Sequence, residues 1–234
     1  MHNLVVACVF KNEAPILKEW ILHYLKWGVE HFYLVNDYST DNYLDIIKDY
    51  PVTLFQNDFQ EGSELTLIYD RYFKEIPSKW VAILDLNEFM WSPSGGIQET
   101  LDDSVSQIKI DLLHFGSSGH NTQPESIVQG FTKRAKFNTS TIYYSYKSIY
   151  QTKYLTCFGV NGHRVNGQTI HYKGNDNPKL IINHYISFKV FKIFSKHTGV
   201  KFDRSSYKTD KTYFIYRDIN LIEDFRLSIL NSQK

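Results

Sequence analysis

The chain has 234 residues, of which 42% are hydrophobic and 22% are charged, and this composition excludes wholesale disorder, collagen-like order and a long coiled coil. At roughly 150 residues per domain, the length excludes a repeat array or a multi-domain machine and predicts one large domain or one domain with an appendage. Lysine and arginine number 26 against 25 acids, so the net charge of +1 excludes the broad basic surface of a nucleic-acid-binding protein.

The cysteine count and the N-terminus predict the compartment. Cys8 and Cys157 are too few for a disulfide framework, which favours a reducing environment. An apolar run begins at Leu4 without a basic leader or a small-residue cleavage site, and no 18 apolar residues run together. We therefore expect a soluble, cytoplasmic protein without a signal peptide or a transmembrane segment.

Strand and helix patterns alternate along the first part of the chain. Apolar runs of strand length lie at 4–10, 32–35, 52–55 and 80–85. Apolar residues at helical spacing lie between them at 15–28, 43–49 and 65–73. Since such alternation favours right-handed crossovers, it predicts an α/β fold with a doubly wound, mostly parallel, Rossmann-like sheet.

The alternation fades beyond Trp91. Strands are expected at 108–115, 127–137, 143–150 and 180–185, and helices near 187–197 and at 220–230. No internal repeat and no low-complexity linker interrupts the chain. We expect one compact domain whose C-terminal half mixes helices and strands.

Polar loops follow three of the predicted strands. They lie at 11–13, 36–41 and 85–88. Each loop alone is as well explained by a helix cap or an Asx turn. Because ligands of open parallel sheets bind beyond the carboxyl ends of the strands, three such loops on one edge predict a binding site there.

The third loop carries oxygen donors at a useful spacing. Asp85 and Asn87 are two residues apart at a strand end, so their side chains would project toward the same side. Such a pair can share a divalent cation, Mg²⁺ or Mn²⁺, or divide between a cation and a ribose. Glu88 would point the other way, where a salt bridge or a buried partner would brace the loop.

These residues resemble a known family. The blocks are KNE at 11–13, DYSTD at 37–41 and WVAILDLNEF at 80–89, followed by HFGSSGH at 114–120, KSIY at 147–150 and NHY at 183–185 with Lys196 beyond. Their order is similar to that of family 2-like glycosyltransferases, and most of all of glycosyltransferase family 92, which has the GT-A fold. The resemblance covers about two thirds of the chain.

The resemblance implies transfer of a sugar from a nucleoside diphosphate donor, most often a uridine diphosphate sugar, to a glycan acceptor, with Mn²⁺ or Mg²⁺ on the diphosphate. It implies a single GT-A domain over 1–234, with a nucleotide-sugar half at 1–91, an acceptor-side half at 92–200 and a C-terminal tail and helix at 201–234. That tail would close over the acceptor, pair two subunits in a homodimer, or simply pack on the sheet.

The family's roles carry over to individual positions. The donor-binding residues would be Ala7, Lys11, Glu13, Asp37, Arg71, Asp85 and Lys196. The metal ligands would be Asp85, Asn87 and His184. The chain departs from the family at one of them, since the family's pattern reads Asp-x-Asp-Glu-Phe and Asn87 offers an amide oxygen without charge. The metal is then bound weakly with help from His184 and the diphosphate, or is not used, or this position was altered to trap a complex.

The transfer also needs a proton acceptor and an acceptor site. If configuration inverts, a carboxylate must take the proton of the acceptor hydroxyl, and Glu125 is the first candidate and Asp176 the second. Ser118, His120 and His163 lie in or beside glycine-containing turns where acceptor-binding loops are expected. Each of these five residues is also explained as an ordinary loop residue.

Two other functions remain open. A degenerate transferase would bind a nucleotide sugar or a glycan without turnover, which Asn87 makes plausible. A nucleotidyltransferase would show a glycine- and arginine-rich phosphate loop after the first strand, and residues 11–15 contain none. The sequence also lacks a Walker loop, a Gly-x-Gly-x-x-Gly motif and zinc-ligand spacing.

Overall fold

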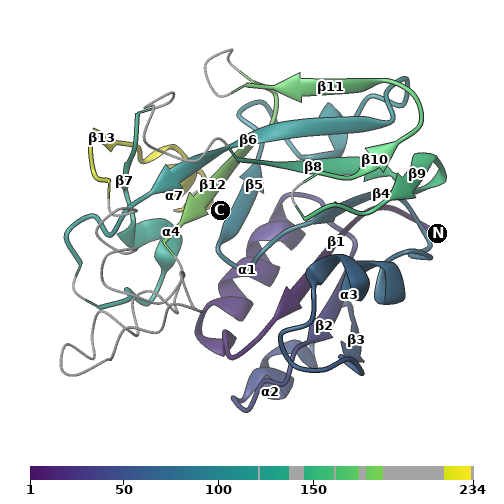
Figure 1. Cartoon of the computed structure of the whole chain (residues 1–234). Coiled ribbons are helices and arrows are strands. Elements are labelled where there is room, and N and C mark those ends of the chain that lie inside the picture. Colours follow the sequence, from purple (N-terminus) through teal and green to yellow (C-terminus); the bar gives the residue numbers. More distant parts are fainter. Residues whose placement is uncertain (121, 137–144, 161, 174–177, 187–218, 233–234) are drawn as a thin grey trace. The chain divides into compact units, whose positions relative to one another are not determined.

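The computed structural model describes residues 1–120, 122–136, 145–160, 162–173, 178–186 and 219–232 (Figure 1). The chain forms two compact units, each described here by itself. The first unit comprises Met1–Leu112 and Ser145–Ile182, and the second comprises Leu113–Tyr144 and Asn183–Lys234. No helix within the described ranges is both long and apolar enough to cross a membrane.

A mixed sheet forms the centre of the first unit (Figure 1). Its strands are β1 (His2–Phe10), β2 (His31–Asn36), β3 (Val52–Gln56), β4 (Ser78–Ile83), β6 (Gln107–Phe115), β8 (Tyr146–Gln151) and β11 (Thr169–Tyr172). β1 pairs in parallel with β2 and β4, and β2 pairs in parallel with β3. β8 runs antiparallel between β4 and β6, and β11 joins β6 in parallel.

Helices cover both faces of the parallel part. On one face, α1 (Ala14–Lys26) places the ring of Trp20 5.6 Å from Phe32 of β2, and α2 (Tyr43–Ile47) packs against the end of β1. On the other face, α3 (Leu65–Tyr72) packs Ile68 and Tyr69 into a buried cluster with Val5 of β1. The predicted α/β class with a doubly wound parallel sheet is therefore confirmed.

Short elements complete the described chain. They are β5 (Glu88–Trp91), a 3₁₀ helix at Gln98–Thr100, α4 (Ile127–Gly130), β7 (Lys133–Arg134), a 3₁₀ helix at Thr152–Tyr154, β9 (Leu155–Cys157), β10 (Arg164–Val165), β12 (Ile181–Tyr185), β13 (Ile222–Glu223) and α7 (Arg226–Ser232). β9 and β10 form an antiparallel pair, as do β7 and β13.

Two expected elements of the second unit are corrected. The strand expected at 127–137 is instead the short helix α4 followed by β7, because the hydroxyl of Ser126 accepts the backbone N–H of Gln129 at 3.1 Å and caps a helical turn. The helix expected at 220–230 starts only at Arg226, because 222–223 pair with β7 as β13. The helix expected near 187–197 lies outside the described residues.

Two side chains of α1, Trp20 and Tyr24, hold the turn after β4 in place. Trp20 Nε1 donates to the carbonyl oxygens of both Asp85 and Glu88 at 3.1 Å. The hydroxyl of Tyr24 donates to the carbonyl of Glu88 at 2.9 Å and accepts the N–H of Met90 at 2.8 Å. Because buried backbone groups need partners, the inward face of α1 fixes the path of residues 85–90.

The hydroxyl of Tyr24 provides a stability test of this clamp. Tyr24→Phe removes the hydroxyl that accepts the buried N–H of Met90 and leaves the carbonyl of Glu88 with Trp20 Nε1 as its donor. We therefore expect the free energy of unfolding to fall by about 1–3 kcal/mol. Urea denaturation followed by far-UV circular dichroism measures it. Tyr38→Phe is the matched control, since Tyr38 is 45% exposed and its hydroxyl bonds the carbonyl of Phe59 at the surface. Equal losses in both variants would contradict the clamp.

Candidate functional site

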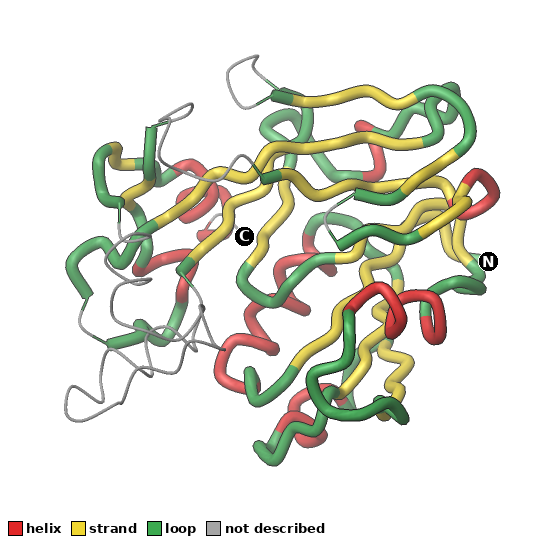
Figure 2. Tube along the Cα trace, in the orientation of Figure 1, coloured by secondary structure: helices red, strands yellow, loops and turns green. Residues whose placement is uncertain are grey.

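The carboxyl ends of the parallel strands form one edge of the first unit, called the rim below. Phe10 is aligned with Asn36, and Asn36 with Gln56, so β1, β2 and β3 end level with one another. The N–H of Leu84 donates to the carbonyl of Ala7 and carries the chain after β4 to the same edge. The loops at 11–13, 37–41, 57–61 and 84–87 therefore share the rim (Figure 2).

The first two rim loops bond to each other. The N–H of Asn12 donates to the hydroxyl of Ser39 at 2.9 Å, and the side-chain oxygen of Asn12 accepts the N–H of Thr40 at 2.7 Å. Asp41 accepts the N–H of Ala14 at 2.9 Å, so a residue of the second loop caps the helix that follows the first. Each loop holds the other in a fixed conformation.

Three residues with backbone φ in the left-handed region lie in the predicted ligand loops. They are Asn12 (54°), Tyr38 (59°) and Ser118 (53°), and the described part of the chain has no other non-glycine residue with positive φ. Asparagine tolerates this conformation, whereas tyrosine and serine adopt it at an energetic cost. Backbone strain of this kind collects at functional sites.

Asp37 lies at the start of the second loop and is partly exposed. Its carboxylate accepts the side-chain N–H of the buried Asn57 at 2.8 Å, and its backbone N–H donates to the carbonyl of Phe10 at 2.8 Å. This pair of bonds fixes the carboxylate at the rim, where it can accept hydrogen bonds from hydroxyl or N–H groups of a ligand.

A lysine from β8 reaches the turn after β4. Lys147 Nζ lies 3.3 Å from a carboxylate oxygen of Asp85 and 3.3 Å from one of Glu88. The side chains of Lys147 and Glu88 are 5% and 2% exposed, whereas that of Asp85 is 50% exposed. Since β8 runs antiparallel to β4, the start of β8 lies beside the end of β4, and this topology brings the ammonium to the rim. The salt bridge expected for Glu88 is confirmed.

Burial and charge act in opposite directions on this group. Burial raises the pKa of Glu88 to about 7, while the neighbouring ammonium of Lys147 opposes that rise. Burial alone would lower the pKa of Lys147, but the carboxylates of Asp85 and Glu88 outweigh burial and hold it above its usual value. Lys147 is therefore a permanent positive charge at the rim.

The residues at this turn fit a divalent cation poorly. Asp85 already faces an ammonium, Glu88 is buried against the same ammonium, and Asn87 is a buried neutral amide at 8% exposure. Divalent cations of this class are held by one or two free carboxylates together with substrate phosphates. Within the described ranges, no three His, Cys, Asp or Glu side chains are grouped closely enough to hold a metal ion.

The remaining predicted donor residues lie in different surroundings. Lys11 forms an ion pair with Glu61, which joins the first rim loop to the third. Glu13 precedes α1. Ala7 is fully buried within β1, and its donor-binding role stays a prediction. Lys196, like the second base candidate Asp176, lies outside the described residues.

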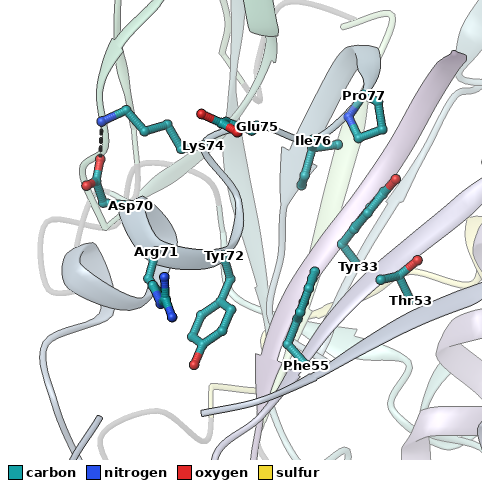
Figure 3. Close-up of a pocket in the computed structure, with 10 residues that line it drawn as sticks. All are labelled: Tyr33, Thr53, Phe55, Asp70, Arg71, Tyr72, Lys74, Glu75, Ile76 and Pro77. Atoms are coloured by element: carbon teal, nitrogen blue, oxygen red, sulfur yellow. Dashed lines mark ion pairs between the residues drawn. The ribbon is translucent and has the colours of Figure 1, made fainter. Parts of the chain in front are cut away.

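Arg71 lies at a groove on the α3 face of the sheet (Figure 3). Its guanidinium donates to Asp58 of the third rim loop at 3.0 Å, and the hydroxyl of Tyr72 donates to the same carboxylate at 2.6 Å. The groove has a volume of about 590 Å³. Its lining residues are Tyr33, Thr53, Phe55, Asp70, Arg71, Tyr72, Lys74, Glu75, Ile76 and Pro77. Arg71 thus braces a rim loop from the groove side.

Four predicted residues belong to the second unit. Glu125 and His120 are exposed there. The hydroxyl of Ser118 accepts the N–H groups of Thr132 and Lys133 at 2.8 Å each, which is a structural role. His184 Nδ1 lies 2.9 Å from Nδ1 of His114, so one of its ring nitrogens is engaged within that unit. The convergence of His184 with Asp85 stays a prediction.

His163 has a structural setting that differs from the predicted acceptor-binding role. It is 6% exposed, and its ring packs 4.8 Å from that of Tyr150 and 5.4 Å from that of Phe158. Direct contact with an acceptor is therefore disfavoured. Conversely, Lys147 of the KSIY block was not predicted as a site residue, and the signal for it in the sequence is a single charge beside a buried strand pattern.

Comparison with known proteins bears on the identity of this site. No family profile matches the chain. A glycosyltransferase family 92 protein of Ricinus communis is 22% identical over 210 residues, which cover 83% of this chain and 37% of the relative. Another of Oryza sativa subsp. japonica is 22% identical over 210 residues, 82% of this chain and 34% of the relative. The resemblance to glycosyltransferase family 92 is confirmed, and the chain spans about a third of the length of these curated relatives.

A solved structure gives a weaker likeness. Residues 1–349 of S. aureus TarS in complex with UDP align with 64% of this chain and 47% of that chain, at 15% identity and a TM-score of 0.42.

The burial of His163 predicts a pH dependence of stability. Burial, assisted by the nearby charge of Lys147, lowers the pKa of His163 from 6.5 to about 4. Between about pH 6.5 and pH 4, His163 is protonated in the unfolded chain and neutral in the folded chain. The free energy of unfolding therefore keeps its full value above pH 6.5 and decreases as the pH falls toward 4. The difference in pKa of His163 between the two states lowers the free energy of unfolding at pH 5 by about 2 kcal/mol relative to pH 7.5.

Urea denaturation of the wild type and of His163→Gln at the two pH values tests this. The difference in unfolding free energy between pH 7.5 and pH 5 should shrink by about 2 kcal/mol in the variant. His120→Gln, at an exposed histidine, is the control and should leave the difference unchanged. An unaltered pH dependence in His163→Gln would contradict a neutral buried imidazole.

Proposed function

We propose that this chain is a glycosyltransferase that moves a sugar from a nucleoside diphosphate, expected to be uridine diphosphate, to a hydroxyl of a glycan acceptor. The observation that carries the proposal is the rim, where loops from four parallel strand ends gather Asp37 and Asp85 on one edge. The similarity to glycosyltransferase family 92 proteins over 83% of the chain supports the reaction class.

The rim suits a nucleoside diphosphate for three physical reasons. Its loops are bonded to one another, so the donor meets groups that are already in place. Its two partly exposed carboxylates can accept hydrogen bonds from the ribose hydroxyls and from the N–H of the base. It also lies at the carboxyl ends of parallel strands, where nucleotides bind in open α/β sheets.

The chemical step moves one bond, one pair of electrons and one proton. The acceptor oxygen forms a bond to the anomeric carbon of the sugar, and the bond from that carbon to the diphosphate oxygen breaks, so the diphosphate leaves with the electron pair. In an inverting transfer, a carboxylate takes the proton of the acceptor hydroxyl, and Glu125 is the proposed base because it is an exposed acid beside a turn of the second unit.

Donor binding is tested by removing the charge of Asp37. Asp37→Asn should weaken binding of UDP, measured by isothermal titration calorimetry, by about 10- to 100-fold, since a hydrogen bond to a charged group contributes about 1.5–3 kcal/mol. Asp45→Asn, on the exposed face of α2, is the matched control and should bind UDP as the wild type does. Equal affinities of the two variants would remove Asp37 from the donor site.

The base is tested by an isosteric change of Glu125. Glu125→Gln should keep UDP affinity and lower sugar transfer by about 10²- to 10⁴-fold, because general base catalysis contributes a factor of that size. Transfer is measured with a panel of UDP-sugars as release of UDP in the presence of glycan acceptors. Glu64→Gln is the control for a neutralised acid elsewhere. Wild-type protein that binds UDP-sugars and never releases UDP would favour the non-catalytic binding protein instead.

A further inference from the structure

The turn after β4 combines two carboxylates with a built-in cation. Lys147 Nζ contacts Asp85 and Glu88 at the same distance, 3.3 Å, and Glu88 also accepts the N–H of Asp85 at 2.9 Å. With Lys147 buried at 5% exposure, the ammonium cannot leave the carboxylates for solvent. With both carboxylates ionised, two negative charges and one positive charge leave this group with a net charge of −1; since burial raises the pKa of Glu88 to about 7, this holds above neutral pH.

The residue at position 87 determines whether the net charge of this turn is that of a metal-binding site. An aspartate there would give three acids against one ammonium, and a net charge of −2 would attract a divalent cation and repel a diphosphate more strongly than −1 does. Asn87 removes one of these charges and leaves a buried amide, which is a weak ligand. The amide at 87 and the ammonium at 147 therefore both act to remove the need for a metal.

We propose that this rim binds its diphosphate donor without a divalent cation, and that Lys147 is the positioning residue that replaces the metal by holding and partly neutralising Asp85. The inference rests on the proposed function and specifies how that site handles charge.

The geometry divides the roles between the three side chains. Asp85 is half exposed, so it presents its carboxylate outward to a hydroxyl of the donor while Lys147 holds it from behind. Glu88 is buried and keeps Lys147 in place. The ammonium itself does not touch the ligand; its charge offsets the repulsion between Asp85 and the donor phosphates.

The first experiment measures UDP binding by calorimetry in EDTA and in 5 mM Mn²⁺ or Mg²⁺, concentrations on the order of those used to saturate weak cation sites. We expect dissociation constants within about twofold of each other. Binding that appears or tightens more than about tenfold only with a cation would overturn the inference and leave the proposed function standing. Absence of UDP binding in all three conditions would reject both.

The second experiment restores the family's acid. Asn87→Asp should acquire Mn²⁺ binding, measured without nucleotide by electron paramagnetic resonance of free Mn²⁺, and its UDP affinity should become Mn²⁺-dependent. The wild type should leave the Mn²⁺ signal unchanged. If the wild type binds Mn²⁺ as tightly as Asn87→Asp, the substitution has no effect on cation use and the inference is wrong.

The third experiment removes the built-in cation. Lys147→Met alone strands a buried Glu88 carboxylate and is expected to destabilise the fold, so it is combined with Glu88→Gln, which keeps the buried pair neutral. The net charge of the group stays at −1 in this double variant, but Asp85 loses the ammonium that lies 3.3 Å from it. The variant should therefore bind UDP at least about tenfold more weakly in EDTA, with recovery on addition of Mn²⁺. Lys79→Met, which breaks an exposed ion pair with Asp103, is the control and should behave as the wild type. Wild-type affinity of the double variant in EDTA would show that Lys147 has only a structural role.

Discussion

The rim depends on the burial of one carboxylate. Glu88, the first residue of β5, is 1% exposed, and a buried charge without a partner would cost several kcal/mol. Lys147 and the N–H of Asp85 supply the partners. Because Lys147 comes from β8, about 60 positions away along the chain, the turn reaches its final conformation only when β8 has paired with β4. The same ion pairs that satisfy Glu88 also place Asp85 at the surface.

The other rim loops are also held by hydrogen bonds between polar groups that are far apart in the sequence. Asn12 donates its N–H to Ser39 and accepts the N–H of Thr40, and Asp41 caps α1 from a loop that is distant in sequence. Such bonds offset the strain of Tyr38 in the left-handed region. A site whose donors and acceptors are already oriented loses little conformational entropy when a ligand binds, which favours tight binding of a flexible diphosphate.

The sequence predicted the first unit well because its signals are local. Each parallel strand is a continuous apolar run, and α1 shows its buried face at helical spacing, so neighbours along the chain suffice to identify them. The prediction of a strand at 127–137 was wrong because one capping hydrogen bond to Ser126 outweighed the strand propensity of the apolar residues. The partners of Asp85 and the burial of His163 could not be predicted, because they depend on the order of the strands in the sheet rather than on sequence spacing.

Strand order also explains why a neutral residue at position 87 is compatible with a donor site. An antiparallel β8 beside β4 delivers an ammonium to the turn whatever stands at position 87, since Lys147 is required by Glu88. Once that charge is present, each further acid at the turn has to be balanced from outside the protein, whereas an amide does not. Asn87 and Lys147 thus both act on the charge at the rim. Under the proposed function, the buried lysine would contribute the positive charge that a bound cation contributes elsewhere.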